Sequence, residues 1–154
     1  MTQTEKMDKA AILHVPLSQY AFATSEYTIT IRLRAKKSDL TRCVLYTADR
    51  VCRTTPICFA GTDMKICAVD ECFEYYEANL QLPYNRICYY FKLEKGKEWT
   101  YYYADRFTKE LPDRVVDGKL IDGRSEYYQY PFILRSEIPD LREWFKEAVV
   151  YNIF

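Results

Sequence analysis

The segment YTITIRLR, residues 27–34, is the feature that most limits what this 154-residue chain can fold into. Apolar and polar side chains alternate along it without interruption, and the apolar positions are Tyr27, Ile29, Ile31 and Leu33. Because successive side chains of a β-strand point to opposite faces, this alternation predicts a strand with one face on a core and the other in water. One-sided strands of this kind are typical of antiparallel sheets.

A second strong signal is a hairpin predicted over residues 85–106. Its first strand carries apolar residues at alternate positions from Ile87 to Leu93, and a turn is expected at residues 95–96. In the second strand we assign the face of Trp99, Tyr101 and Tyr103 to the core. Tyr90 and Tyr102 are then expected together on the opposite face, as an aromatic platform or as ordinary cross-strand packing.

The other strand signals are shorter and less regular. Strands are predicted over residues 11–16, 41–48, 72–82 and 127–133, the third with a bulge near Tyr75 and Tyr76. Residues 35–39 predict a polar turn, and residues 105–126 predict a charged loop with turns at 117–118 and 122–123. Residues 49–70 carry a turn signal at 61–63 and form either two short strands or a structured loop.

These patterns predict an all-β fold. Aromatic residues make up 16% of the chain, and Tyr and Phe favour pleated surfaces. We expect an immunoglobulin-like antiparallel β-sandwich of about seven to eight strands, although the Cys–Trp–Cys signature of antibody domains is absent.

The last residues follow a different pattern. A short helical stripe of Leu141, Trp144 and Phe145 precedes AVVYNIF, residues 148–154, which is apolar on both faces as in α/β-barrel strands. We therefore expect a disordered segment over residues 1–10 and a β-sandwich module over 11–135. Residues 136–154 are expected to hold a linker, a short helix and the first strand of a truncated catalytic barrel, which makes the chain a piece of a longer protein. Without barrel partners, residues 148–154 should be disordered or pair with a neighbouring molecule.

Charge and cysteine usage narrow the class of protein. The chain has 22 basic and 22 acidic side chains, so a nucleic-acid or membrane partner is not expected. No targeting segment is visible, which predicts a cytoplasmic protein whose six cysteines are reduced, small, buried thiols. A zinc site is not expected, because no C-x-x-C occurs and the single histidine, His14, is distant in sequence. His14 is expected to support a strand end locally.

Several stretches together resemble one enzyme family. WFKEAVVYNIF, residues 144–154, resembles the entry into the catalytic barrel of neopullulanase, cyclomaltodextrinase and maltogenic amylase enzymes of glycoside hydrolase family 13. Upstream segments resemble the N-terminal module of the same enzymes in order and spacing: residues 14–39, 42–50, 61–63, 73–78 and 86–93. Ser38 and Asn152 depart from the family pattern, which usually has Gly and Gln there.

The resemblance implies a module of carbohydrate-binding module family 34. Such a module precedes the barrel, packs on the barrel of a second subunit and narrows that active site, which favours cyclodextrins and short maltooligosaccharides. The expected partners are α-glucan oligosaccharides or cyclodextrins, the chain's own barrel and a second subunit. The nucleophile and the acid/base of the family lie on later barrel strands, so no catalysis and no cofactor are expected of this chain. The parent is expected to be a glycoside hydrolase of the α-amylase clan, in which calcium is possible.

The candidate contact residues for sugar or partner are Asp49, Arg50, Tyr46, Tyr90 and Tyr102. In the family an aromatic residue directly after the Asp–Arg pair often reaches the partner's sugar site, but here that place holds Val51. The alternative interpretation puts Tyr46 in the core and lets Asp49 and Arg50 close a solvated turn by pairing with each other.

Three functions are therefore open. The first is a module that contacts carbohydrate and forms a dimer. The second is a structural dimerisation or docking domain that binds no sugar. The third is an unrelated immunoglobulin-like adaptor.

Overall fold

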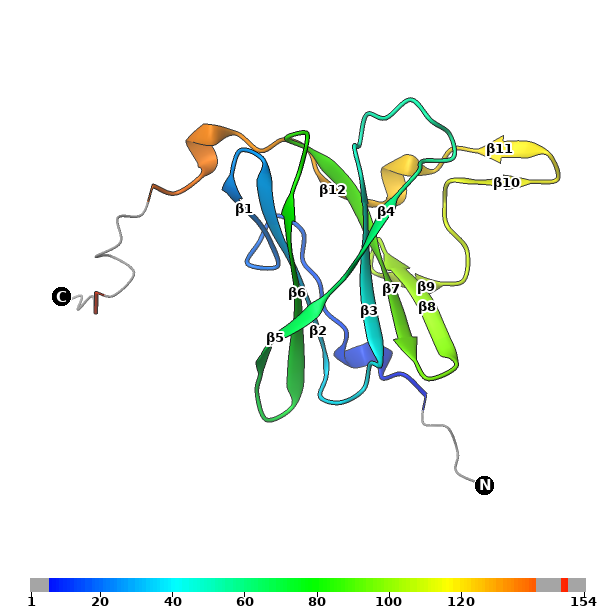
Figure 1. The fold of residues 1–154 in the computed structure, drawn as a ribbon. Helices are drawn as coiled ribbons and strands as arrows, with labels where there is room; N and C mark the ends of the chain where they lie inside the picture. Colours follow the sequence, from blue (N-terminus) through cyan, green and yellow to red (C-terminus); the bar gives the residue numbers. More distant parts are fainter. Residues whose placement is uncertain (1–5, 141–147, 150–154) are drawn as a thin grey trace, which may run out of the picture.

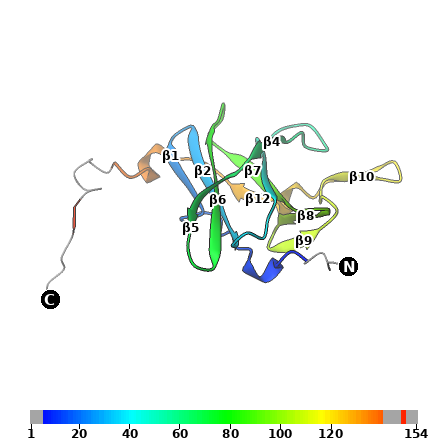
Figure 2. The ribbon, with the colours of Figure 1, turned by 60° about the horizontal axis from the view of Figure 1, so that its bottom comes forward.

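The computed structural model describes residues 6–140 and 148–149, and these residues form two antiparallel β-sheets packed face to face (Figures 1 and 2). The first sheet has the order β1 (Ala21–Ser25), β2 (Thr28–Lys36), β6 (Phe73–Gln81), β5 (Lys65–Val69). The second has the order β4 (Ala60–Asp63), β3 (Arg42–Ala48), β7 (Ile87–Lys95), β8 (Glu98–Tyr103), β9 (Arg106–Thr108), and β12 (Tyr128–Tyr130) also pairs with β7.

Smaller elements complete the described part. A separate hairpin joins β10 (Arg114–Val116) to β11 (Lys119–Ile121) and projects from one end of the sandwich (Figure 1). Three short 3₁₀ helices are present in the described ranges: η1 (Lys9–Ala11), η2 (Arg124–Glu126) and η3 (Arg135–Glu137). None of the helices among these residues is long and apolar enough to cross a membrane. The predicted all-β antiparallel sandwich is confirmed, and its short additional strands raise the count above seven to eight.

The core lies between β2 of the first sheet and β7 of the second. Ile29, Ile31 and Leu33 are fully buried, as the alternation predicts, and face a second fully buried row: Ile87, Tyr89, Phe91 and Leu93. Tyr27 does not belong to this face; it is exposed because β2 begins only at Thr28. Burying such side chains contributes about 1.5–3 kcal/mol each, so these two strands supply much of the stability of the fold.

Several predicted turns and strands shift in the structure. Residues 11–16 form no strand, because Leu13 makes a single bridge to Arg34 before the chain turns away. The predicted turn at 35–39 begins late, since β2 continues through the fully buried Ala35. Within the stretch 1–10, for which we predict disorder, Met7 is buried in the core.

Residues 49–70 hold both a loop, over residues 49–59, and two short strands, β4 and β5. The predicted turn at 61–63 lies inside β4, and β5 follows after the single residue Met64. The bulge predicted in β6 lies in its partner instead: β5 shifts register between Ile66 and Ala68, opposite Tyr76 and Tyr75. The pairing of β2 with β6 remains regular along its full length. The continuous pairing with β2 explains why the extra residue is placed in the shorter edge strand.

The faces of the β7–β8 hairpin differ from the prediction. A two-residue turn joins Lys95 to Glu98, and Phe91 pairs directly with Tyr102. Directly paired residues share a face, so the odd-numbered core face of β7 continues as the even-numbered face of β8. Tyr102 is therefore buried, whereas Trp99 and Tyr101 are half-buried on the outer face. The predicted pairing of Tyr90 with Tyr102 on one face is wrong.

The segment after β8 is more structured than a charged loop. It contains β9, β10 and β11, and the predicted turn at residues 117–118 joins the last two. Asp117 and Gly118 both have positive φ, 50° and 71°, which is the conformation that short hairpin turns favour. The predicted strand at 127–133 is confirmed as the shorter β12. The predicted terminal helix, residues 139–147, and the predicted barrel strand, residues 148–154, lie outside the described residues except for 139–140 and 148–149, which are in neither a helix nor a strand.

Candidate functional site

The outer face of the six-stranded sheet carries a row of aromatic side chains. Tyr46 of β3 and Tyr90 of β7 are direct cross-strand partners, and their rings stack with centroids 5.0 Å apart and planes 6° apart. Tyr90 then meets Tyr101 of β8 edge-on at 5.4 Å, and Tyr101 meets Trp99 at 5.1 Å. These four residues, Tyr46, Tyr90, Tyr101 and Trp99, are called the outer aromatic row below.

A glycine lets this row lie close to the sheet. A Cβ on Gly61 of β4 would come within 3.0 Å of a Tyr46 ring carbon, so the ring rests directly on the β4 backbone. A side chain at position 61 would push the Tyr46 ring away from the position in which it stacks on Tyr90.

Within the row, Tyr90 is covered and the other three residues are partly exposed. Phe59 and Tyr127 pack on Tyr90 at 4.9 Å and 5.5 Å, so Tyr90 is only 4% exposed. Its burial raises the pKa of the Tyr90 phenol well above its ordinary value, which keeps it neutral. Tyr46, Tyr101 and Trp99 remain half-exposed.

Charged side chains lie around Trp99, at one end of the row. Lys109 and Lys92 lie over the Trp99 ring, with their ammonium nitrogens 3.9 Å and 5.4 Å from a ring centroid. Lys92 also binds Glu94 at 2.8 Å. An apolar ring surface with a few placed polar groups is the arrangement that binds neutral polar ligands, because the rings supply contact area and the polar groups fix orientation.

Residues 49–59 connect β3 to β4 and are called the 49–59 loop below. The loop meets the row where Phe59 packs on Tyr90. Arg86 donates two hydrogen bonds to the Asp49 carboxylate, from Nε at 2.8 Å and from Nη2 at 3.2 Å. The hydrogen bond from Arg86 is the main cause that lowers the pKa of Asp49. Arg50 instead donates from Nε to Oε1 of Gln129 at 3.0 Å. The alternative in which Asp49 and Arg50 pair with each other is therefore wrong.

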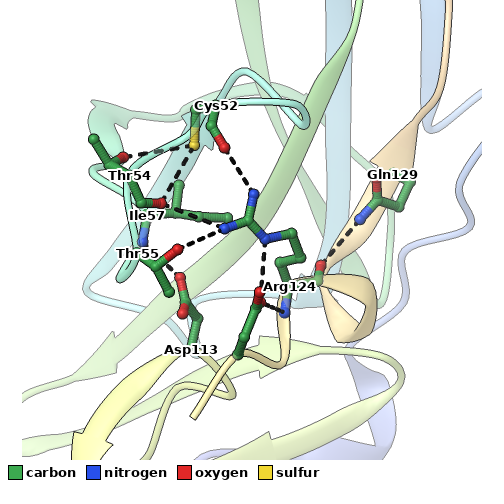
Figure 3. A network of polar contacts seen from close by, with 8 residues as sticks. Cys52, Thr54, Thr55, Ile57, Asp113, Arg124 and Gln129 are labelled. Carbon is green, nitrogen blue, oxygen red and sulfur yellow. Dashed lines mark hydrogen bonds and ion pairs between the residues drawn. The ribbon is translucent and has the colours of Figure 1, made fainter. Parts of the chain in front are cut away.

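A polar network fastens the 49–59 loop to the segment before β12 (Figure 3). The Arg124 guanidinium donates to the Cys52 carbonyl at 2.7 Å and to the Thr55 hydroxyl at 2.9 Å. Nearby, the Ile57 N–H donates to the buried carboxylate of Asp113 at 2.5 Å. Val51 lies at the loop surface, 50% exposed, where the resemblance leads one to expect an aromatic residue.

Two predicted residues lie away from this face. Tyr102 stacks on Phe107 at 4.7 Å inside the sandwich and offers no surface. His14 is 1% exposed, and because a carbonyl can only accept, its Nδ1–H donates to the Arg32 carbonyl at 2.7 Å. Its Nε2 therefore accepts from the Tyr89 hydroxyl at 2.9 Å. His14 thus joins strands of both sheets, rather than one strand end.

The cysteines differ from the prediction in their burial. All six are free thiols, but only Cys43 and Cys88 are buried, and burial raises the pKa of Cys88 to about 12. The exposed thiols lie in loops or on the edge strand β5: Cys58, Cys67 and Cys72. Over residues 6–140 and 148–149, no three His, Cys, Asp or Glu side chains gather in a way that could hold a metal ion.

The structure therefore brings together Tyr46 and Tyr90, places Asp49 and Arg50 in the adjoining loop, and removes Tyr102 from the site. Sequence reasoning missed Trp99 and Tyr101 because it assigned their face to the core. It also missed Arg124, which lies 72 residues from its loop partner Cys52. The signal that was available was the two-residue turn after Lys95, which fixes which faces of β7 and β8 coincide.

Comparisons with known proteins agree with this fold. The family described as "Alpha amylase, N-terminal ig-like domain" matches residues 7–134. Neopullulanase 2 of Thermoactinomyces vulgaris is 34% identical over 152 residues, which cover 94% of this chain and 23% of that protein. A Cyclomaltodextrinase of Bacillus sp is 30% identical over 144 residues, covering 94% of this chain and 24% of that protein.

A solved structure matches as well. A structure of a Cyclomaltodextrinase superposes with a TM-score of 0.76 at 27% identity, over 92% of this chain and 22% of that one. This chain thus spans between 22% and 24% of the length of these relatives. The resemblance to neopullulanase, cyclomaltodextrinase and maltogenic amylase enzymes is confirmed, and this chain belongs to the family of α-amylase N-terminal immunoglobulin-like domains.

Proposed function

We propose that this chain is the N-terminal module of a cytoplasmic enzyme that hydrolyses α-glucans, and that it contributes carbohydrate contact and dimer formation. The observation that carries the proposal is the set of half-exposed rings in the outer aromatic row: Tyr101 and Trp99 adjoin each other beside charged groups, and Tyr46 lies beyond the buried Tyr90. Hydrolysis belongs to a catalytic barrel in the longer protein, a glycoside hydrolase of the α-amylase clan that acts on cyclodextrins, maltooligosaccharides or pullulan.

The chemistry of the row suits a pyranose ring. The apolar face of a glucose unit can lie on Tyr101 or Trp99, while Lys92 and Glu94 lie close enough to hydrogen-bond its hydroxyls. Only three half-exposed rings are available and the face is shared with ion pairs, so we expect weak binding. A dissociation constant of about 1 mM, equivalent to about −4 kcal/mol, is the expected order.

A docking domain that binds no sugar is the second candidate, and a specific observation favours it. The hairpin of β10 and β11 leaves four aliphatic side chains between 38% and 56% exposed: Val115, Val116, Leu120 and Ile121. Val115 and Leu120 are direct cross-strand partners on one face of the hairpin, so they offer a protein partner an apolar patch that sugars do not need. The exposed Val51 adds an apolar side chain in the 49–59 loop. The expected partner is a second subunit of the parent enzyme or its own barrel.

Amide chemical shifts of the ¹⁵N-labelled chain, titrated with maltotriose or β-cyclodextrin to millimolar concentration, test the first candidate. We expect shifts on β3, β7 and β8 that disappear in Trp99→Ala. The matched control is Tyr75→Ala, which removes a half-buried aromatic residue from the outer face of the other sheet. Shifts that are absent, or that vanish equally in the control, would remove the carbohydrate role and leave the docking role.

Dimer formation is tested separately in the parent enzyme. Val115→Asp combined with Leu120→Asp places two charges on one face of the hairpin, because these residues are direct cross-strand partners. We expect sedimentation velocity to show a larger monomer fraction than in the unaltered enzyme. An unchanged sedimentation profile would exclude the hairpin as a subunit contact.

A further inference from the structure

The 49–59 loop has no strand pairing of its own to fix its shape. β3 ends at Ala48 and β4 begins at Ala60, so the backbone between them makes none of the ladder bonds of the sheet. Within the loop, one backbone bond closes a turn, from the Cys52 N–H to the Asp49 carbonyl at 3.0 Å. Its conformation must therefore be set mainly by side chains from elsewhere in the molecule.

One guanidinium group, that of Arg124, makes three of these contacts (Figure 3). Nη1 of Arg124 donates to the Cys52 carbonyl at 2.7 Å, and Nη2 donates to the Thr55 hydroxyl at 2.9 Å and to the Thr54 carbonyl at 3.4 Å. Nε of Arg124 donates to Asp122 at 3.1 Å, which orients the guanidinium toward the loop. Three loop residues are thus held by a single side chain.

The backbone of Arg124 is also linked to Arg50, through hydrogen bonds to the side chain of Gln129. The Arg124 carbonyl accepts from Nε2 of Gln129 at 3.1 Å, and Oε1 of Gln129 accepts from Nε of Arg50 at 3.0 Å. Gln129 in turn lies on β12, opposite Cys88 of β7. Both ends of the exposed Val51 tip are therefore tied to residue 124, directly through Cys52 and indirectly through Arg50.

We propose that Arg124 is a positioning residue for the contact surface of this module. It fixes the 49–59 loop, and so sets where Arg50 and the exposed Val51 stand for a second subunit of the parent enzyme. The inference rests on the proposed function, because it assumes that the loop takes part in that contact. Lysine cannot replace arginine here, since its single ammonium cannot reach acceptors that diverge from the two ends of a planar fork.

The test compares Arg124→Lys with the matched control Arg106→Lys. Arg106 pairs with Glu126 of the same 3₁₀ helix but makes no contact with the loop. In Arg124→Lys we expect the amide shifts of residues 50–55 to move and the hydrogen exchange of Cys52, whose N–H closes the loop turn on the Asp49 carbonyl, to rise at least tenfold, while β7 keeps its protection. Arg106→Lys should leave the loop unchanged. If Arg124→Lys does not fold, Thr55→Val removes one acceptor and should produce a smaller change of the same kind.

The binding arm measures dimer formation in the parent enzyme. We expect Arg124→Lys to weaken the dimer about fivefold or more, with a melting temperature close to that of the control variant, whereas maltotriose binding on Tyr101 and Trp99 should not change. Loop signals that coincide with the unaltered protein, or a loop that moves equally in Arg106→Lys, would overturn the proposal. If the unaltered protein binds neither sugar nor partner, the proposed function fails, and the loop signals alone decide whether Arg124 positions the loop.

Discussion

Acidification should destabilise this chain through His14, its single histidine. Burial among aromatic rings lowers the pKa of His14 from 6.5 to about 4 in the folded protein. The rings around it belong to Tyr20, Tyr89, Phe91 and Tyr128, and Asp105 is the one carboxylate that acts on it, with a smaller, opposite effect. The folded state therefore holds a neutral imidazole where the unfolded chain would accept a proton.

The sign and size follow from this difference. Between pH 6.5 and 4 the unfolded chain binds the proton and the folded protein does not, so stability rises with pH. The contribution is complete above about pH 6.5 and is lost as the pH falls toward 4. The whole difference corresponds to about 3 kcal/mol, and at pH 5 about 2 kcal/mol of it should already be gone.

Urea unfolding at pH 7.5 and pH 5, followed by circular dichroism, measures the effect. His14→Gln is the comparison, because its amide cannot titrate while the carboxylates still contribute equally to both proteins. We expect the unaltered protein to lose about 2 kcal/mol more than the variant between these pH values. A ¹H titration of the single imidazole gives the pKa directly. A value near 6.5, or equal losses in both proteins, would refute the reasoning.

Three further predictions concern the core, the two faces of β8 and the thiols. Phe91→Ala should lower the free energy of unfolding by about 3–5 kcal/mol in urea titrations, because Phe91 is fully buried. Tyr102→Ala should lower the free energy of unfolding and leave the sugar-induced amide shifts intact. Tyr101→Ala should remove those shifts and change the free energy of unfolding little. Equal effects of the two variants would contradict the assigned faces. A thiol reagent should label three cysteines in the folded protein and spare two until urea is added: Cys58, Cys67 and Cys72 against Cys43 and Cys88.

The sandwich could be predicted because its central strands are patterned. Ile29, Ile31 and Leu33 alternate with polar residues, and a slip of one residue would turn all three from the core to water. The edge elements carry no such constraint. Gly61 is a turn residue by local preference, but pairing with Tyr46 draws it into β4. Tertiary pairing overrides local preference there, and no short window of sequence contains that information.

The site was harder to predict for two reasons. Odd-numbered residues of β7 face the core, so a β8 residue faces the core only when its β7 partner is odd-numbered. An error of one residue in the pairing therefore exchanges the faces of Tyr101 and Tyr102. The 49–59 loop depends on Arg124, which is brought near only after β7 and β12 have paired. Contacts across such sequence distances follow from topology, so they become visible only once the sheet order is known.

The transition from β4 to β5 at Met64 has a mechanical consequence. Asp63 pairs with Val44 in one sheet and Lys65 pairs with Glu77 in the other, so one residue spans the two layers. Its N–H donates to the Cys43 carbonyl at 2.9 Å and its side chain is buried. Since neighbouring Cα atoms are about 3.8 Å apart, the two layers cannot slide past each other at this edge without breaking a ladder. Met64 therefore links the two sheets covalently at this edge, so that the sandwich resists shear.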